Sequence, residues 1–188
     1  ALASLLPRPQ QILTDAIPRI EEIEKDGLNP AIERVWKDEM AAMTADLRVW
    51  LEKLADEGAD WTPERFEFAF GLPHMAGRDP DSTPERALAG GRFKLRGSID
   101  MIERHRKTRF LRVTDHKTGR NRTRSGQTVI AGGRVLQPVV YGLALKALHP
   151  DETVFSGRLF FCTTAGGFET HEIPLMGEAP KGGLEAAE

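Results

Sequence analysis

The feature that most constrains the fold is a pair of alternating segments within residues 93–115. In residues 93–101, apolar side chains or glycine occupy every second position, and the positions between them are polar or charged. Alternation with a period of two is typical of a strand whose two faces have different surroundings. The basic sequence ERHRKT follows, and RFLRVTD at residues 109–115 again reads as a strand. We therefore expect an antiparallel hairpin with an exposed basic turn.

Helical patterns precede this hairpin. Residues 8–26 have roughly helical apolar spacing, interrupted by Pro18. Residues 31–54 carry an apolar side chain every three or four positions, which predicts a long amphipathic helix. The sequence DGLNP lies between the two segments and predicts a turn, with Asn29 as the N-cap and Pro30 as the first residue of the second helix.

The remaining segments complete one sheet. RFEFAFG predicts a strand whose apolar face carries Phe66, Phe68 and Phe70 in the core, and we expect Trp50 of the long helix to be buried as well. Residues 119–133 are polar and predict a mobile loop, and residues 136–148 predict a helix. VFSGRLFFC and FETHEIPL then predict a second antiparallel pair. The order of elements favours an α/β or α+β fold with one central mixed sheet flanked by helices.

Composition excludes several classes of protein. The 188 residues suit one domain, and the formal net charge of −2 gives no general preference for nucleic acid. We expect no membrane span, because no apolar run approaches about 18 residues, and no secretory leader is evident. The single cysteine, Cys162, excludes an internal disulfide and a four-cysteine iron–sulfur cluster within this chain, and it suits the cytoplasm. The start at Ala1 and the glycine-rich end lead us to expect a fragment of a longer protein.

Two charged residues, Asp115 and Lys117, lie at the end of the second strand of the hairpin, where a turn would be expected. Asp115 and Lys117 are two residues apart, so they project from one face, and the hairpin places Asp100, at the end of the first strand, beside Asp115 at a sheet edge. Two adjacent carboxylates repel each other unless a divalent cation lies between them, and Mg²⁺, or Mn²⁺, needs only one or two protein carboxylates. Lys117 would then orient a metal-activated water. The alternative is an ordinary surface ion pair.

Three short motifs follow one another along the chain: GSID, VTDHKTG and LQPVVY. In their order and intervals they resemble the RecB-like branch of the PD-(D/E)xK nuclease superfamily. The matching pairs are Gly97 with Asp100, Asp115 with Lys117, and Gln137 with Tyr141. The resemblance implies a restriction-endonuclease-like core and metal-dependent hydrolysis of DNA, as in the exonuclease domain of a helicase–nuclease in DNA repair and recombination. We accordingly expect one domain: a helical part at 1–60, a nuclease core at 61–175 and a tail at 176–188.

The resemblance also assigns roles to residues. Asp100, Asp115 and the main-chain carbonyl of His116 would hold the metal, and Lys117 would assist the attacking water. Gln137 and Tyr141 lie one helical turn apart and would contact or position DNA, although ordinary helix packing is the alternative. The arginines that would bind phosphate groups are Arg96, Arg120, Arg122 and Arg124. The implied partners are DNA and a helicase domain or subunit.

Two other interpretations stay open. The RecB-like branch has an upstream helical histidine as a further metal ligand, but no histidine precedes His74 in this sequence. Either this histidine lies before Ala1 in a longer protein, or the protein lacks it. The second case favours a catalytically inactive relative that binds DNA ends or supports a helicase. A metal-dependent hydrolase of small molecules is the third interpretation. Glu67 would supply another carboxylate if it faced the site, but its strand position fits an exposed side chain better.

Overall fold

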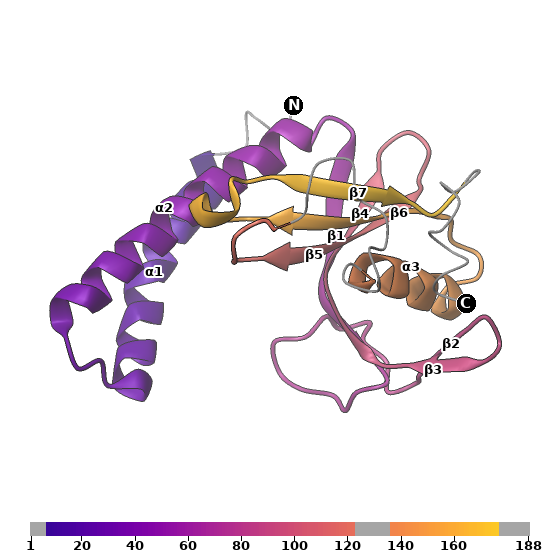
Figure 1. Cartoon of the computed structure of the whole chain (residues 1–188), viewed down its shortest axis with the longest axis horizontal. Helices are drawn as coiled ribbons and strands as arrows, with labels where there is room; N and C mark the ends of the chain where they lie inside the picture. Colours follow the sequence, from indigo (N-terminus) through magenta and orange to yellow (C-terminus); the bar gives the residue numbers. More distant parts are fainter. Residues whose placement is uncertain (1–6, 123–135, 177–188) are drawn as a thin grey trace.

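The computed structural model describes residues 7–122 and 136–176, and Figure 1 shows a sheet with helices beside it. The helices are α1 (Pro7–Leu28), α2 (Glu33–Glu57) and α3 (Gln137–Leu148), with a short 3-10 turn at Thr164–Gly166. The strands are β1 (Trp61–Phe70), β2 (Ala87–Ala89), β3 (Phe93–Leu95), β4 (Gly97–His105), β5 (Leu111–Lys117), β6 (Val154–Phe161) and β7 (Thr170–Pro174). Of the described helices, none is long and apolar enough to span a membrane.

The main sheet has five strands in the order β1-β4-β5-β6-β7. β5 and β6 are parallel, and the other neighbouring pairs are antiparallel, so the sheet is mixed. The predicted hairpin is β4–β5, and the predicted second pair is β6–β7. The parallel β5–β6 pair needs a crossover connection, which includes α3. The predicted fold class is therefore confirmed.

An apolar core lies between α3 and one face of the sheet. Ala144 and Leu145 of α3 pack with buried side chains such as Phe68, Ile102 and Val113. At Gly157 of β6 the helix approaches the sheet so closely that an added Cβ would lie 2.4 Å from the carbonyl oxygen of Pro138. Only glycine permits this approach, which brings the N-terminal end of α3 onto the sheet.

A layer of buried ion pairs occupies the opposite face. Alternation along β5 turns Val113 toward α3 and Arg112 away from it. Arg112 and Arg158 both pair with Glu103, which is 1% exposed, and both also reach Glu57 at the C-terminal end of α2. Thr114 donates a hydrogen bond to Glu103, so this acid is fully paired although it is buried. The end of α2 is thereby fixed to the sheet by charge, whereas α3 is held by apolar contact.

The basic turn of the hairpin differs from the prediction. Arg104, which the prediction placed in the exposed turn, is buried. Arg104 pairs with Glu64 and Glu152, whose side chains lie 40 and 48 residues away in sequence. Residues 106–109 of the turn are exposed as predicted. Arg104 is buried because acids from distant parts of the chain neutralise it.

Local predictions failed where the backbone leaves regular geometry. Asn29 is not an N-cap: it has a φ of 44° and its N–H donates to Lys25 at the end of α1, and α2 begins after Ile32. The predicted strand at 93–101 is interrupted at Arg96, which separates β3 from β4. In β1, Glu67 has a φ of 53°, and Phe66 is 51% exposed while Phe68 is buried, so the predicted single apolar face is wrong at Phe66.

Candidate active site

The two predicted acids lie on neighbouring interior strands of the sheet. Asp100 belongs to the first half of β4, which continues to His105, so it does not end its strand at a sheet edge as predicted. The last pair in the β4–β5 register on this side is Met101 with Thr114, so Asp100 and Asp115 are the next residues along. A carboxylate oxygen of Asp100 accepts a hydrogen bond of 2.7 Å from the main-chain N–H of His116. The acids therefore approach each other where the two strands cease to pair.

Asp115 is the buried member of this acid pair. Its side chain is 3% exposed, and its Oδ2 lies 2.5 Å from Nζ of Lys117. Apart from that ion pair, Oδ2 has no hydrogen-bond partner among the described residues. Burial raises the pKa of Asp115, the contact with Lys117 opposes this rise, and the charge of Asp100 adds to it. A buried carboxylate with a free lone pair is a position where a cation would be stabilised.

His116 points to the other face of the sheet, as alternation predicts. Its Nε2 accepts a hydrogen bond of 3.2 Å from the indole N–H of Trp50, and its Nδ1 lies 3.8 Å from Oδ2 of Asp100. Burial lowers the pKa of His116, which favours a neutral ring with the proton on Nδ1, facing Asp100. Trp50 is only partly buried and contacts this ring edge-on, so it belongs to the surroundings of the site rather than to the core. The sequence offered no signal for this contact, because the two residues are 66 positions apart.

The N-terminal end of α3 completes the arrangement on the Asp115 side. Lys117 donates to Oε1 of Gln137 at 2.8 Å, and Gln137 donates to the hydroxyl of Tyr141 at 3.0 Å. Gly97 shows how closely the helix approaches: an added Cβ would lie 3.2 Å from the ring of Tyr141. The three motifs therefore meet through a chain of contacts from Asp115 to Tyr141.

Three of the arginines predicted to bind phosphate lie at the end of the β4–β5 hairpin that carries the acid pair. Arg96 directly precedes β4, and Arg120 and Arg122 follow β5; all three are exposed. Since β4 and β5 are antiparallel, the start of one and the end of the other are at the same end of the hairpin. Arg124 lies outside the described residues.

The donor set suits a metal with few protein ligands. Among the described residues, no cluster of three or more histidine, cysteine, aspartate or glutamate side chains is arranged to hold an ion. Two carboxylates remain, and Mg²⁺ accepts such a site because it retains several waters. The buried carboxylate of Asp115, whose pKa is raised although Lys117 pairs with it, supports this fit. The carbonyl of His116 stays a predicted ligand, and Glu67 is exposed and accepts a hydrogen bond from Ser98.

Comparison with known proteins agrees with this geometry. The family model of the PD-(D/E)XK nuclease superfamily matches residues 5–177, which include both acids, Lys117 and α3. A search of the curated proteins gave no match.

Proposed function

Because the chain belongs to the PD-(D/E)XK nuclease superfamily, we propose that it hydrolyses DNA phosphodiester bonds with a bound Mg²⁺ or Mn²⁺. The observation that carries this proposal is the pair Asp100 and Asp115, in which the buried carboxylate of Asp115 has Lys117 as its one ion-pair partner among the described residues and keeps a raised pKa. Family membership supports cleavage of nucleic acid, and the acid pair supports the use of a metal.

Each side chain has a chemical task in this proposal. Asp100 and Asp115 hold the metal, which when bound lowers the pKa of a coordinated water and offsets negative charge on the phosphate. Lys117 orients the attacking water or stabilises the charge that develops on the phosphorus-bound oxygens. Gln137 fixes the Lys117 ammonium by accepting its hydrogen bond, and Tyr141 in turn fixes Gln137.

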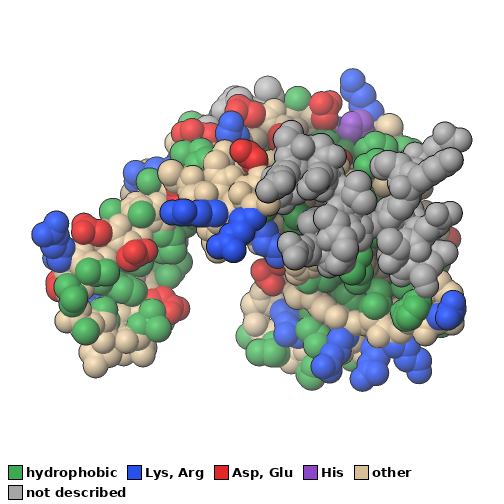
Figure 2. All heavy atoms as spheres, in the orientation of Figure 1, with side chains coloured by type: hydrophobic (Ala, Val, Ile, Leu, Met, Phe, Trp, Pro, Cys, Tyr) green, Lys and Arg blue, Asp and Glu red, His purple; other side chains and the backbone are tan. Residues whose placement is uncertain are grey.

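Exposed basic side chains support binding of a phosphate backbone. Arg96, Arg120 and Arg122 stand at the end of the hairpin that carries the acids. Further exposed cations lie on and beside β2–β3, which packs against α3: Arg86, Arg92 and Lys94. Figure 2 shows lysine and arginine side chains gathered over this lower part of the body. Contacts of this kind supply affinity without reading the sequence of the DNA.

The narrower assignment rests on the motifs. Gly97, Gln137 and Tyr141 match the RecB-like branch, and in the structure an added Cβ at Gly97 would touch the ring of Tyr141. We therefore propose an exonuclease domain that works with a helicase domain or subunit in DNA repair and recombination.

Cleavage by single-site variants tests the proposal. Asp115→Ala or Lys117→Ala should lower Mg²⁺-dependent cleavage of a labelled DNA duplex and of a single strand by at least about 100-fold. Lys107→Ala, on the exposed turn at the far end of the hairpin, is the matched control and should cleave like the wild type. Circular dichroism shows whether each variant is folded. Cleavage that survives both site variants would contradict the assignment.

A second candidate function is a non-catalytic DNA-binding or scaffold domain. The observation in its favour is that no group of three or more acidic, histidine or cysteine side chains in residues 7–122 and 136–176 is arranged to hold a metal ion. In that case the wild type would bind DNA ends in a gel-shift assay but would show no cleavage with either metal. Binding would then be unchanged in Asp115→Ala.

A further inference from the structure

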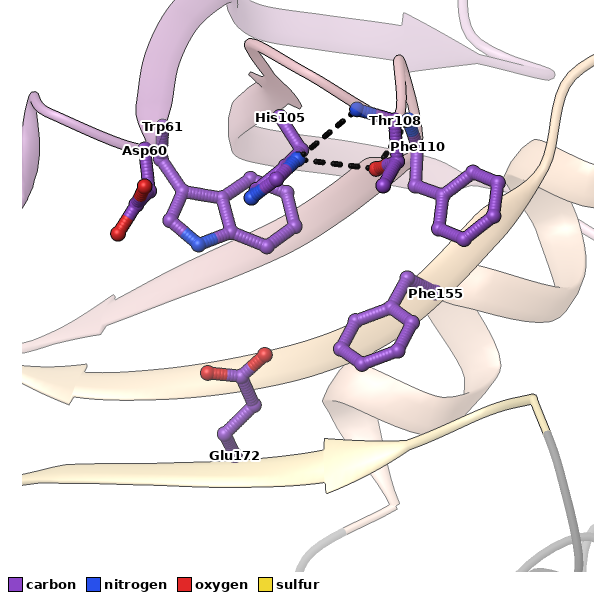
Figure 3. A pocket seen from close by; sticks show the side chains of 7 residues that line it. All are labelled: Asp60, Trp61, His105, Thr108, Phe110, Phe155 and Glu172. Carbon is purple, nitrogen blue, oxygen red and sulfur yellow. Dashed lines mark hydrogen bonds between the residues drawn. The ribbon is translucent and has the colours of Figure 1, made fainter.

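A pocket of about 490 Å³ lies at the opposite end of the β4–β5 hairpin from the acid pair. Its walls are four rings, from Trp61 at the start of β1, His105 and Phe110 of the turn region, and Phe155 of β6. Figure 3 shows these rings around a hollow, with Trp61 on one side and Phe110 and Phe155 on the other. The volume is within the range of sites that bind small molecules or side chains.

The rings are held in place by contacts with one another. Trp61 meets His105 edge-on with ring centres 5.0 Å apart, and Phe110 stacks with Phe155 at 6.2 Å. The main-chain N–H of Thr108 donates to Nδ1 of His105 at 3.1 Å, which fixes the orientation of the imidazole. The pocket is therefore formed before any ligand arrives, which reduces the entropy lost on binding.

Two carboxylates give the pocket its charge. Asp60 is exposed at one side, and Glu172 of β7 lies at another (Figure 3). Glu172 also contacts Arg112, which belongs to the buried ionic layer. Among the described residues, that layer contains two arginines, 112 and 158, against three glutamates, 57, 103 and 172, so these five side chains carry one excess negative charge. Glu172 and Glu57 are the partly open glutamates of this layer, with 36% and 32% of their side chains exposed, and Glu172 is the one that lies at the pocket.

Aromatic faces and carboxylates together select a cation. The face of an aromatic ring is electron-rich and attracts an ammonium or guanidinium group. Trp61 already shows this preference, since the guanidinium carbon of Arg112 lies 4.3 Å from its ring centre. No lysine or arginine is among the described residues that line the pocket. An anion would meet two carboxylates, and an apolar ligand would desolvate Asp60 without compensation.

We propose that this pocket binds the guanidinium group of an arginine side chain from a partner protein. A planar guanidinium stacks on aromatic rings and pairs with carboxylates. A lysine ammonium also pairs with carboxylates but stacks on aromatic rings less well. Arginine is also enriched at protein interfaces. The site is separate from Asp100 and Asp115, so it does not depend on the proposed cleavage activity.

The test uses N-acetyl-arginine amide as the probe and the intact chain as the receptor. NMR titration with the probe should show a saturable shift of the Trp61 indole N–H signal. That signal is assigned by its absence from the spectrum of Trp61→Phe. Asp60→Asn and Phe155→Leu should each weaken binding about twofold to fivefold. Asp56→Asn and Phe93→Leu are matched controls, because both residues are exposed and neither lines the pocket; they should bind like the wild type.

Comparison of probes decides the chemical class. N-acetyl-lysine amide should bind more weakly than the arginine probe, and the glutamate and leucine analogues should cause no saturable shift. Equal binding of the leucine or glutamate analogue would overturn the proposal, and so would unchanged affinity in both pocket variants. A lysine analogue that binds as tightly as the arginine probe would overturn the preference for guanidinium.

Discussion

Two groups of charged side chains lie a few residues apart on β4 and β5, and they differ in how fully they are paired. In the ionic layer, Glu103 accepts hydrogen bonds from Arg112, Arg158 and Thr114. In the acid pair, Asp115 has a similarly buried side chain, but among the described residues Lys117 is its one ion-pair partner.

The difference separates a structural role from a binding role. Paired arginines outweigh the cost of burying Glu103, and the pKa of that acid is lowered despite its burial. Asp115 lacks such compensation, and its pKa is raised. An acid that the fold leaves under-compensated is a place where a ligand can supply the missing charge. Both acids are buried, so burial alone does not distinguish the two roles.

The largest effect is expected at Glu103. Glu103→Ala leaves Arg112 and Arg158 buried without their shared partner, and should lower the free energy of unfolding by about 3–5 kcal/mol. Urea denaturation measures this loss. Glu85→Ala, an exposed acid, is the control and should change stability by less than about 0.5 kcal/mol. A loss at Glu103 no larger than the control would show that the ionic layer does not hold α2 to the sheet.

A smaller effect of opposite sign is expected at Asp115. Asp115→Asn removes an under-compensated charge while it keeps the shape of the side chain, so the metal-free variant should melt at a higher temperature at neutral pH. A gain of about 1 kcal/mol corresponds to roughly 2–4 °C for a chain of this length. Differential scanning calorimetry without divalent metal measures the shift. A lower melting temperature at neutral pH would show that the ion pair with Lys117 already compensates Asp115.

The smallest expected effect is the change with pH in the difference between the melting temperatures of the wild type and Asp115→Asn. The folded-state pKa of Asp115 is raised, so the protonated form stabilises the fold at acid pH, and this stabilisation is lost as the pH rises through the raised pKa. The melting temperatures of wild type and Asp115→Asn should therefore be closest at about pH 4 and should diverge toward neutral pH. A constant difference across this range would contradict the raised pKa.

Sequence patterns predicted the elements whose stability comes from regular burial. Period-two alternation identified the β4–β5 hairpin, and helical spacing identified α2 and α3 to within three residues. The patterns failed at Phe66, because the left-handed backbone at Glu67 interrupts the alternation. They also failed at Arg104, because a charged residue is assigned to solvent unless its distant partners are known.

The positions of the predicted site residues on the strands followed from the sequence, but their surroundings did not. The spacing of the motifs was enough to place Asp100, Asp115 and Lys117 on adjacent strands, since strand geometry fixes their direction. The motifs did not predict how the strands pair across the sheet. Asp100 and Asp115 lie on interior strands, because β1 pairs with β4 on one side and β6 pairs with β5 on the other. The support of His116 by Trp50 depends on how α2 lies against the sheet, which no local pattern encodes.

Metal binding by the acid pair tests the central claim most directly. Isothermal titration of the wild type with Mn²⁺ should give saturable binding, and Asp100→Asn and Asp115→Asn should each weaken it at least tenfold, because a carboxylate ligand is lost. Asp151→Asn, an exposed acid beyond α3, is the control and should bind like the wild type. Absence of saturable binding, or binding that persists unchanged in both site variants, would contradict the account.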